Sequence, residues 1–211
     1  MNQPVVEGGV IAGNFEDKYS SPNPVARHLM NGFLRAVREL VTASDCVEAL
    51  EAGCGEGLLA IHLHTHLDLR IRATDFSQQI LEKARANAGE AGVDIPFDVL
   101  DLNQAPRDQE RSDLVVCCEV LEHLEDPEFT LANLVQLARK RLVLSVPREP
   151  IWRALNLARG KYLGDLGNTP GHLQHWSRRS FVEMVSRHAE VLEVRSPLPW
   201  TVVLARPRVS Q

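Results

Sequence analysis

The sequence lacks an excess of basic residues and a paired-cysteine motif. Lys and Arg number 23 against 28 Asp and Glu, giving a formal net charge of −5, so nucleic acid is not the expected partner. The four cysteines, Cys46, Cys54, Cys117 and Cys118, form no C-x-x-C pair, which argues against a zinc ribbon or a thioredoxin-like motif. We expect them to be small buried residues in a reducing compartment.

Long apolar runs are also missing. No stretch approaches the roughly 20 apolar residues of a helical membrane span, and the N-terminus has no basic segment ahead of its apolar residues, as a signal peptide would have. The chain has 211 residues, of which 44% are hydrophobic and 24% charged, values typical of one globular domain. We therefore expect a cytoplasmic protein without membrane contact, either a monomer or a homodimer.

Short apolar runs alternate with helical patterns along most of the chain. Residues 1–22 read as an irregular lead-in, and Asn23-Pro24 then begins an amphipathic helix that ends near Thr42. Strands are expected at 47–52, 69–76, 95–102, 113–120 and 141–146. Helices are expected at 57–67, from Ser77 to Gly89 or Gly92, and from Asp126-Pro127 onward. The basic run 139–141 is placed at a helix C-terminus, where cations suit the helix dipole.

The last third of the chain does not follow this alternation of strands and helices. Residues 148–176 are rich in Gly, Pro and aromatic residues, with a short helix expected at about 151–158. Ser177 or Ser180 then caps a helix, and two final strands at 191–196 and 201–207 predict an antiparallel hairpin. The alternation predicts an α/β fold with a mostly parallel sheet and helices on both faces. We divide the single domain into 1–44, a core at 45–147, an acceptor-side insertion at 148–176, and 177–211.

Three glycines occupy alternate positions directly after the first central strand, in VEALEAGCGEGLLA, residues 47–60. The spacing of Gly53, Gly55 and Gly57 is G-x-G-x-G, so it matches neither the dinucleotide pattern G-x-G-x-x-G nor the Walker loop. The loop contains Glu56 but no Lys, Arg, Ser or Thr. It therefore predicts a nucleotide-like ligand that bears positive charge rather than a pyrophosphate.

Acidic residues stand at three successive strand ends. Glu51 precedes the glycine loop, Asp75 ends the second strand and Asp101 ends the third. A carboxylate in the position of Asp75 can accept hydrogen bonds from both ribose hydroxyls, and Phe76 beside it can pack on a flat base. Asp101 can accept from an exocyclic amine such as adenine N6. Because parallel strands end at one edge of a sheet, the three acids predict one nucleoside site.

These stretches resemble the class I S-adenosylmethionine-dependent methyltransferases, in particular the ubiquinone-biosynthesis type. The resemblance lies in EAGCGEG, ATDFS, DLNQAP and SDLVVCCEVLEHLEDPE. It implies a Rossmann-like, doubly wound seven-stranded sheet whose last strand is antiparallel, and S-adenosylmethionine as cofactor with S-adenosylhomocysteine as product. It further implies that Gly53 and Gly55 lie against the methionine part and that the Cys118 carbonyl or the Glu119 region meets the ammonium group. It places Asp101 and Leu102 at the adenine, and Tyr19 as a residue that closes over the cofactor.

The expected acceptor is a small molecule methylated at a hydroxyl oxygen. A base would assist such a transfer by about 10²–10⁴-fold, and the candidates are His123, which follows the fourth strand, and His172 in the insertion. The string Glu119-Val-Leu-Glu122-His123, with His172 four residues before Trp176, also resembles the divalent-metal site of small-RNA 3′-terminal ribose methyltransferases. Glu122, His123 and His172 are therefore the predicted catalytic residues, with a metal as an open alternative.

Two other functions stay open on the sequence. One is a metal-dependent RNA 3′-terminal ribose 2′-O-methyltransferase, which the acidic composition does not favour. The other is a non-catalytic partner that binds the cofactor without turnover. His62 and His66 are expected to share one exposed helix face, and nothing else near them in the sequence indicates a metal site.

Overall fold

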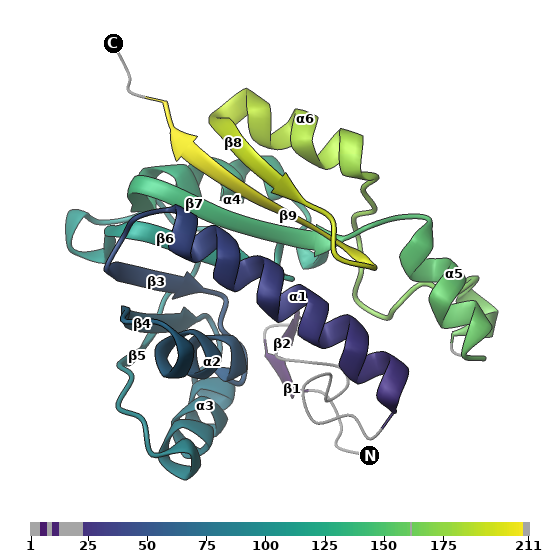
Figure 1. Ribbon diagram of the computed structural model, residues 1–211, viewed down its shortest axis with the longest axis horizontal. Coiled ribbons are helices and arrows are strands. Elements are labelled where there is room, and N and C mark those ends of the chain that lie inside the picture. Colours follow the sequence, from purple (N-terminus) through teal and green to yellow (C-terminus); the bar gives the residue numbers. More distant parts are fainter. Residues whose placement is uncertain (1–4, 8–9, 13–22, 161, 209–211) are drawn as a thin grey trace.

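A computed structural model describes residues 5–7, 10–12, 23–160 and 162–208. A central sheet carries helices on both faces (Figure 1). The elements in chain order are β1 (Val5–Glu7), β2 (Val10–Ala12), α1 (Pro24–Ala43), β3 (Glu48–Ala52), α2 (Leu58–His66), β4 (Arg70–Asp75), α3 (Gln78–Ala91), β5 (Phe97–Val99), η1 (Asp108–Glu110), β6 (Ser112–Cys118), η2 (Leu121–His123), α4 (Pro127–Leu137), β7 (Ala138–Pro147), α5 (Ile151–Ala158), η3 (Leu163–Asp165), α6 (Arg178–His188), β8 (Ala189–Arg195) and β9 (Trp200–Pro207).

The sheet has seven strands in the order β5-β4-β3-β6-β7-β9-β8. Strands β3 to β7 pair in parallel, whereas β9 is antiparallel to both β7 and β8. The predicted Rossmann-like architecture and the antiparallel terminal hairpin are thus confirmed. The strand order reverses between β3 and β6, and open α/β sheets bind ligands at the carboxyl strand ends beside such a switch point.

Two apolar clusters cover the two faces of the sheet. Helices α1, α2 and α3 contribute to one cluster, and α4 and α6 contribute to the other (Figure 1). Neighbouring strand residues alternate between the faces, so Cys117 packs with the α4 side and Cys118 with the α1 side. The four cysteines carry free thiols, and all except the half-buried Cys46 are buried, as the sequence predicts. Among the described residues, no helix is both long and apolar enough to cross a membrane.

The helix N-termini follow the predicted capping residues. The Asn23 side chain accepts the N–H groups of Val25 and Ala26 at the start of α1. Ser77 caps α3, Asp126 caps α4, and Ser177 rather than Ser180 caps α6. Because each side-chain oxygen satisfies N–H groups that the helix cannot pair, these short polar residues fix where the helices begin.

Several expected boundaries are wrong. The lead-in contains the antiparallel pair β1 and β2 instead of irregular chain alone. The third central strand covers Phe97–Val99 only, and the fourth ends at Cys118 instead of continuing to Val120. The basic run 139–141 lies in β7, because α4 already ends at Leu137 and Lys140 Nζ pairs with Asp113 on the neighbouring strand at 2.7 Å.

Two of the three loop glycines are required by the packing of the protein itself. All three have positive φ, 77° at Gly53, 52° at Gly55 and 74° at Gly57. A Cβ on Gly53 would lie 2.5 Å from Cγ2 of Val120, and a Cβ on Gly57 would lie 3.0 Å from the ring of Phe97. The side chain that leaves no room for a Cβ at Gly53 is therefore that of Val120, which follows β6.

Replacing Gly53 with alanine is expected to destabilise the fold by about 2–5 kcal/mol. The left-handed backbone costs about 1–2 kcal/mol, and displacing Val120 adds about 1–3 kcal/mol. Gly92, which has φ 67° and open space around it, is the matched control, and Gly92→Ala is expected to lose only the backbone contribution. Urea unfolding measures both, and equal losses at the two positions would disprove the steric role of Val120.

Candidate functional site

The glycine loop lies at the carboxyl end of β3, beside the point where the strand order reverses. The N–H groups of Gly53 and Cys54 both donate to the Thr74 carbonyl of β4, at 2.8 and 2.9 Å, and the Gly57 N–H donates to the Cys54 carbonyl at 2.9 Å. These bonds fix the loop against the neighbouring strand. Helix α2 then starts without a side-chain cap, so the loop and helix N-terminus form a main-chain surface.

Asp75 links the second strand to the glycine loop. Its Oδ2 accepts the Gly55 N–H at 2.9 Å, and its Oδ1 accepts the Ser77 N–H at 3.1 Å. The side chain is buried, with 6% of its surface exposed. Two backbone donors stabilise a carboxylate held in this position, so the loop and the acid predicted to bind ribose form one connected unit.

Glu51 lies one strand away and is more deeply buried, with 3% of its surface exposed. Its Oε2 is buried and makes no hydrogen bond. Burial is the main cause that raises the pKa of this carboxyl to about 8; the charge of Asp75 also raises it, while the Ala60 backbone opposes the rise. Burial without a compensating charge disfavours the ionised form of this carboxyl.

Asp101, the third acid predicted at a strand end, forms hydrogen bonds within its own turn. Asp101 lies two residues beyond β5 and is half-buried. Its Oδ1 accepts the Asn103 N–H at 2.9 Å, and its Oδ2 accepts the Gln104 side chain at 3.1 Å, so the carboxylate closes a local turn. Leu102 is buried beside it, and Phe76 is half-buried after β4. Strand ends β4 and β5 are paired, which brings these residues to the same edge as Asp75.

Glu119 follows β6 in a conformation that non-glycine residues rarely adopt, with φ 60°. Its N–H donates to the Ser145 carbonyl of β7 at 3.2 Å, and Cys118 before it pairs with Ser145 in the sheet register. Burial raises the pKa of the Cys118 thiol well above its usual value, so this cysteine is no nucleophile. Strained backbone of this kind is often found at binding sites.

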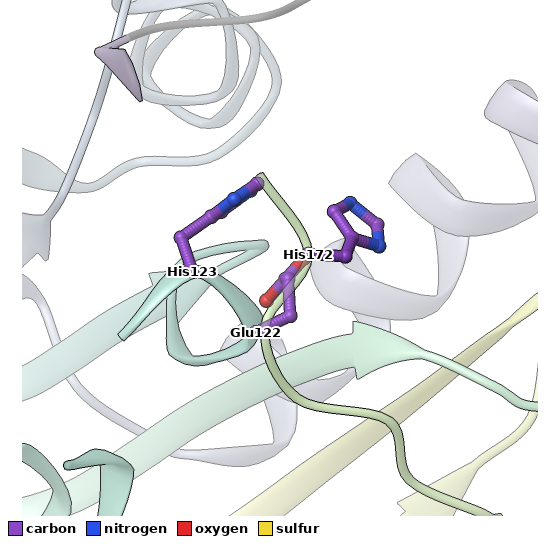
Figure 2. Close-up of side chains that lie close together, drawn as sticks. All are labelled: Glu122, His123 and His172. Atoms are coloured by element: carbon purple, nitrogen blue, oxygen red, sulfur yellow. The ribbon is translucent and has the colours of Figure 1, made fainter. Parts of the chain in front are cut away.

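Glu122, His123 and His172 come together at the end of this turn (Figure 2). Each offers a ligand atom, and these atoms all lie within 4.8 Å of one another. Glu122 lies between the two histidines in the figure and is 1% exposed, while His172 is 6% exposed. His123 Nδ1 lies 2.9 Å from the Gly171 carbonyl; since a carbonyl only accepts, Nδ1 carries the proton and Nε2 keeps its lone pair.

The insertion holds His172 in this position through contacts that the sequence pattern did not predict. The Leu173 and Gln174 N–H groups both donate to the Glu122 carbonyl, at 2.8 and 3.0 Å. The ring of Trp152 in α5 stacks on His172 at a centroid distance of 5.9 Å, and Trp152 Nε1 donates to the Thr169 hydroxyl. In the sequence, only the aromatic residues of 148–176 indicated that this segment packs around His172.

Other predicted site residues lie elsewhere. Tyr19 lies outside the described residues. Among the described residues, Glu119 is not in the group that could share a metal ion, so the expected set of two carboxylates and two imidazoles becomes one carboxylate and two imidazoles. His175, a further histidine of the insertion, is exposed and its Nε2 lies 2.7 Å from Asn168 Oδ1. The rings of His62 and His66 lie 4.2 Å apart, so the two residues share a face of α2 as predicted, but His62 is half-buried instead of exposed.

Comparison with known proteins agrees with this geometry. Residues 49–141 match the methyltransferase domain family. The ubiquinone biosynthesis O-methyltransferase of Coxiella burnetii (strain Dugway 5J108-111) is 28% identical over 113 residues, 53% of this chain and 47% of that protein. Residues 49–141 thus carry the methyltransferase domain, and over this part the chain is similar to the class I S-adenosylmethionine-dependent methyltransferases. It spans about half the length of the curated relatives that it matches.

The fold of this chain also occurs in solved structures of low identity. The magnesium protoporphyrin IX methyltransferase of Synechocystis PCC 6803, solved with bound SAH, has a TM-score of 0.66 and 22% identity over 92% of this chain and 91% of that one. A [4+2]-cyclase has a TM-score of 0.67 and 15% identity over 94% and 88% of the two chains. The same fold therefore carries out different reactions, and the acceptor chemistry must be argued from the site.

Proposed function

We propose that this protein transfers the methyl group of S-adenosylmethionine to a hydroxyl oxygen of a small molecule. The observation that carries the proposal is the connected unit of the glycine loop and Asp75 at the switch point of the sheet. The loop offers main-chain surface without a basic side chain, and the buried Glu51 Oε2 beside it has no partner. These features fit a nucleoside with a cationic methionine end and do not fit a diphosphate.

Each strand end has a role in this proposal. Asp75 accepts the ribose hydroxyls, and Gly53 and Gly55 lie along the methionine part. Phe76, Asp101 and Leu102 border the adenine, because the ends of β4 and β5 are adjacent. Glu119 and the Cys118 carbonyl border the ammonium group at the end of β6. Glu51 is a buried carboxyl that lies two residues before Gly53 in the chain.

The reaction requires alignment more than bond activation. The acceptor oxygen forms a bond to the methyl carbon as the bond from that carbon to sulfur breaks, and the hydroxyl proton leaves to a base. Alignment of the two reactants and exclusion of water supply much of the rate. His123 is suited to take the proton, because the Gly171 carbonyl holds Nδ1–H and leaves Nε2 as the proton acceptor.

Glu122, His123 and His172 also fit a divalent cation. One carboxylate and two imidazoles within 4.8 Å of one another are a ligand set that Mn²⁺ or Zn²⁺ accepts. The Gly171 carbonyl hydrogen-bonds to His123 and orients its ring. Metal-binding histidines commonly make such a bond through the ring nitrogen that does not contact the metal. A bound cation would lower the pKa of a coordinated hydroxyl. We propose that these three residues hold such a cation at the acceptor side of the site.

Isothermal titration with S-adenosylmethionine and S-adenosylhomocysteine tests the cofactor part of the proposal. Binding of both at micromolar to high-micromolar concentration is expected, and no binding would refute the proposed function. Incubation with a panel of phenols and catechols, with and without Mn²⁺, then tests the acceptor class through release of S-adenosylhomocysteine. Cofactor binding without product release on any acceptor would instead support a protein that uses the fold without methyl transfer.

A second candidate is transfer to the 3′-terminal ribose of RNA. The specific observation in its favour is the same cluster of Glu122, His123 and His172, because a cis-diol can coordinate a cation held there. The net charge of −5 disfavours it. Mn²⁺-stimulated methylation of short RNA 3′ ends, lost on His123→Ala, would favour RNA over small molecules.

A further inference from the structure

Glu51 is a buried carboxyl next to the glycine loop, and among the described residues no salt bridge of its side chain is found. It lies in β3, directly before the loop, and 3% of its surface is exposed. Its Oε2 is buried and makes no hydrogen bond. An ionised carboxylate in such a place would lose its hydration without a compensating charge, which strongly disfavours the charged form.

The groups around Glu51 add negative charge or none. Asp75 on β4 is a second carboxylate, which two backbone N–H groups stabilise, and it raises the pKa of Glu51. Cys54 in the loop and Cys117 and Cys118 on β6 are thiols whose pKa values burial and the charge of Glu51 raise. Among the described residues, the backbone of Ala60 lowers the pKa of Glu51, and no basic side chain is found among the groups that lower it. Where two carboxyl groups share a site, one keeps its proton.

We propose that Glu51 is protonated in the free protein and loses its proton when the cationic cofactor binds, becoming the counter-charge of the methionine end. The inference rests on the proposed function, because it needs S-adenosylmethionine at the glycine loop. The O–H bond of the Glu51 carboxyl breaks, its electron pair stays on the carboxylate, and the proton passes to the solvent buffer. The site thereby favours a positively charged ligand over a neutral nucleoside.

Proton release is measurable by titration calorimetry in buffers of different ionisation enthalpy at one pH. With a pKa of about 8, roughly 0.9 of the Glu51 side chains are protonated at pH 7, so binding to the wild-type protein is expected to release up to about 0.9 proton. Glu51→Gln keeps the shape and removes the titrating group. Its release is expected to fall to near zero after subtraction of the cofactor's own contribution.

Glu48→Gln is the matched control, since it makes the same change on the same strand at a residue whose carboxylate pairs with Arg70 at the surface. Its proton release is expected to equal that of the wild-type protein. Equal release from the wild-type protein and Glu51→Gln would overturn the proposal. Failure of the wild-type protein to bind S-adenosylmethionine would instead refute the proposed function, so the two failures are distinguishable.

A measurement on the wild-type protein alone tests the proposal even if Glu51→Gln does not fold. Difference infrared spectroscopy detects protonated carboxyl groups directly. Addition of S-adenosylmethionine at pH 7 is expected to remove one protonated-carboxyl signal and to add one carboxylate signal. A spectrum in which the number of protonated carboxyl groups is unchanged by binding would overturn the proposal without any variant.

Discussion

Asp75→Asn is expected to weaken S-adenosylmethionine binding by about 100-fold or more. The carboxylate accepts the Gly55 and Ser77 N–H groups and, in the proposed complex, the two ribose hydroxyls. An asparagine replaces one acceptor oxygen with an N–H₂ donor. This donor faces a backbone N–H or a ribose hydroxyl that donates, so the hydrogen bond at that position is lost. Hydrogen bonds to a charged group are worth about 1.5–3 kcal/mol each, and about 1.4 kcal/mol corresponds to tenfold in affinity.

Asp98→Asn is the control for this prediction. It makes the same change at an exposed residue of the neighbouring strand β5. Isothermal titration of both variants measures the effect, with thermal unfolding to show that each has folded. Asp98→Asn is expected to bind as the wild-type protein does. A loss of less than threefold at Asp75 would contradict the assignment of this carboxylate to the ribose.

Glu122→Gln is expected to weaken Mn²⁺ binding by about 100-fold or more, with cofactor affinity unchanged. The change removes the one carboxylate of the ligand set and leaves the two imidazoles, and loss of even an outer-shell partner commonly costs 10–100-fold in metal affinity. His172→Ala is expected to have an effect of the same order, since the residue is buried against Trp152 and points to the same cluster. Titration calorimetry with Mn²⁺ measures both.

His175→Ala provides the comparison for the metal prediction. His175 is three positions from His172 on the same segment, but it is exposed and contacts Asn168 instead of the cluster. Mn²⁺ affinity is expected to be unchanged in this variant. If the wild-type protein bound no Mn²⁺, the three residues would not be metal ligands, and His123 would act as the proton acceptor without a cation.

The local signals of the sequence were sufficient for most of the fold. Alternation of apolar runs predicted the parallel sheet, and Asn23, Ser77 and Asp126 predicted the starts of three helices. These predictions succeed because a cap acts on N–H groups two or three residues away. Boundaries failed where tertiary pairing decides: β7 begins at Ala138 because Ala138 pairs with Ser112 of β6, and no local pattern records a contact between residues so far apart.

The sequence also placed Glu51, Asp75 and the glycine loop at one edge, because parallel strands with crossover helices must end together. Asp101 shows the limit of that reasoning, since its carboxylate closes its own turn. The reason for Gly53 could not be read locally either. The side chain that excludes a Cβ there is Val120, 67 positions further along the chain and brought close by the pairing of β3 with β6.

The sequence by itself determined where the strands lie along the chain, where the helices start and which residues are available for chemistry, since these depend on neighbours within a few positions. Only the tertiary structure decided which of those residues meet. His172 reaches Glu122 across 50 residues because backbone N–H groups of the insertion bond to the Glu122 carbonyl. Burial likewise raises the pKa of Glu51, because a pKa depends on the surrounding charges and solvent, and only the folded chain sets both.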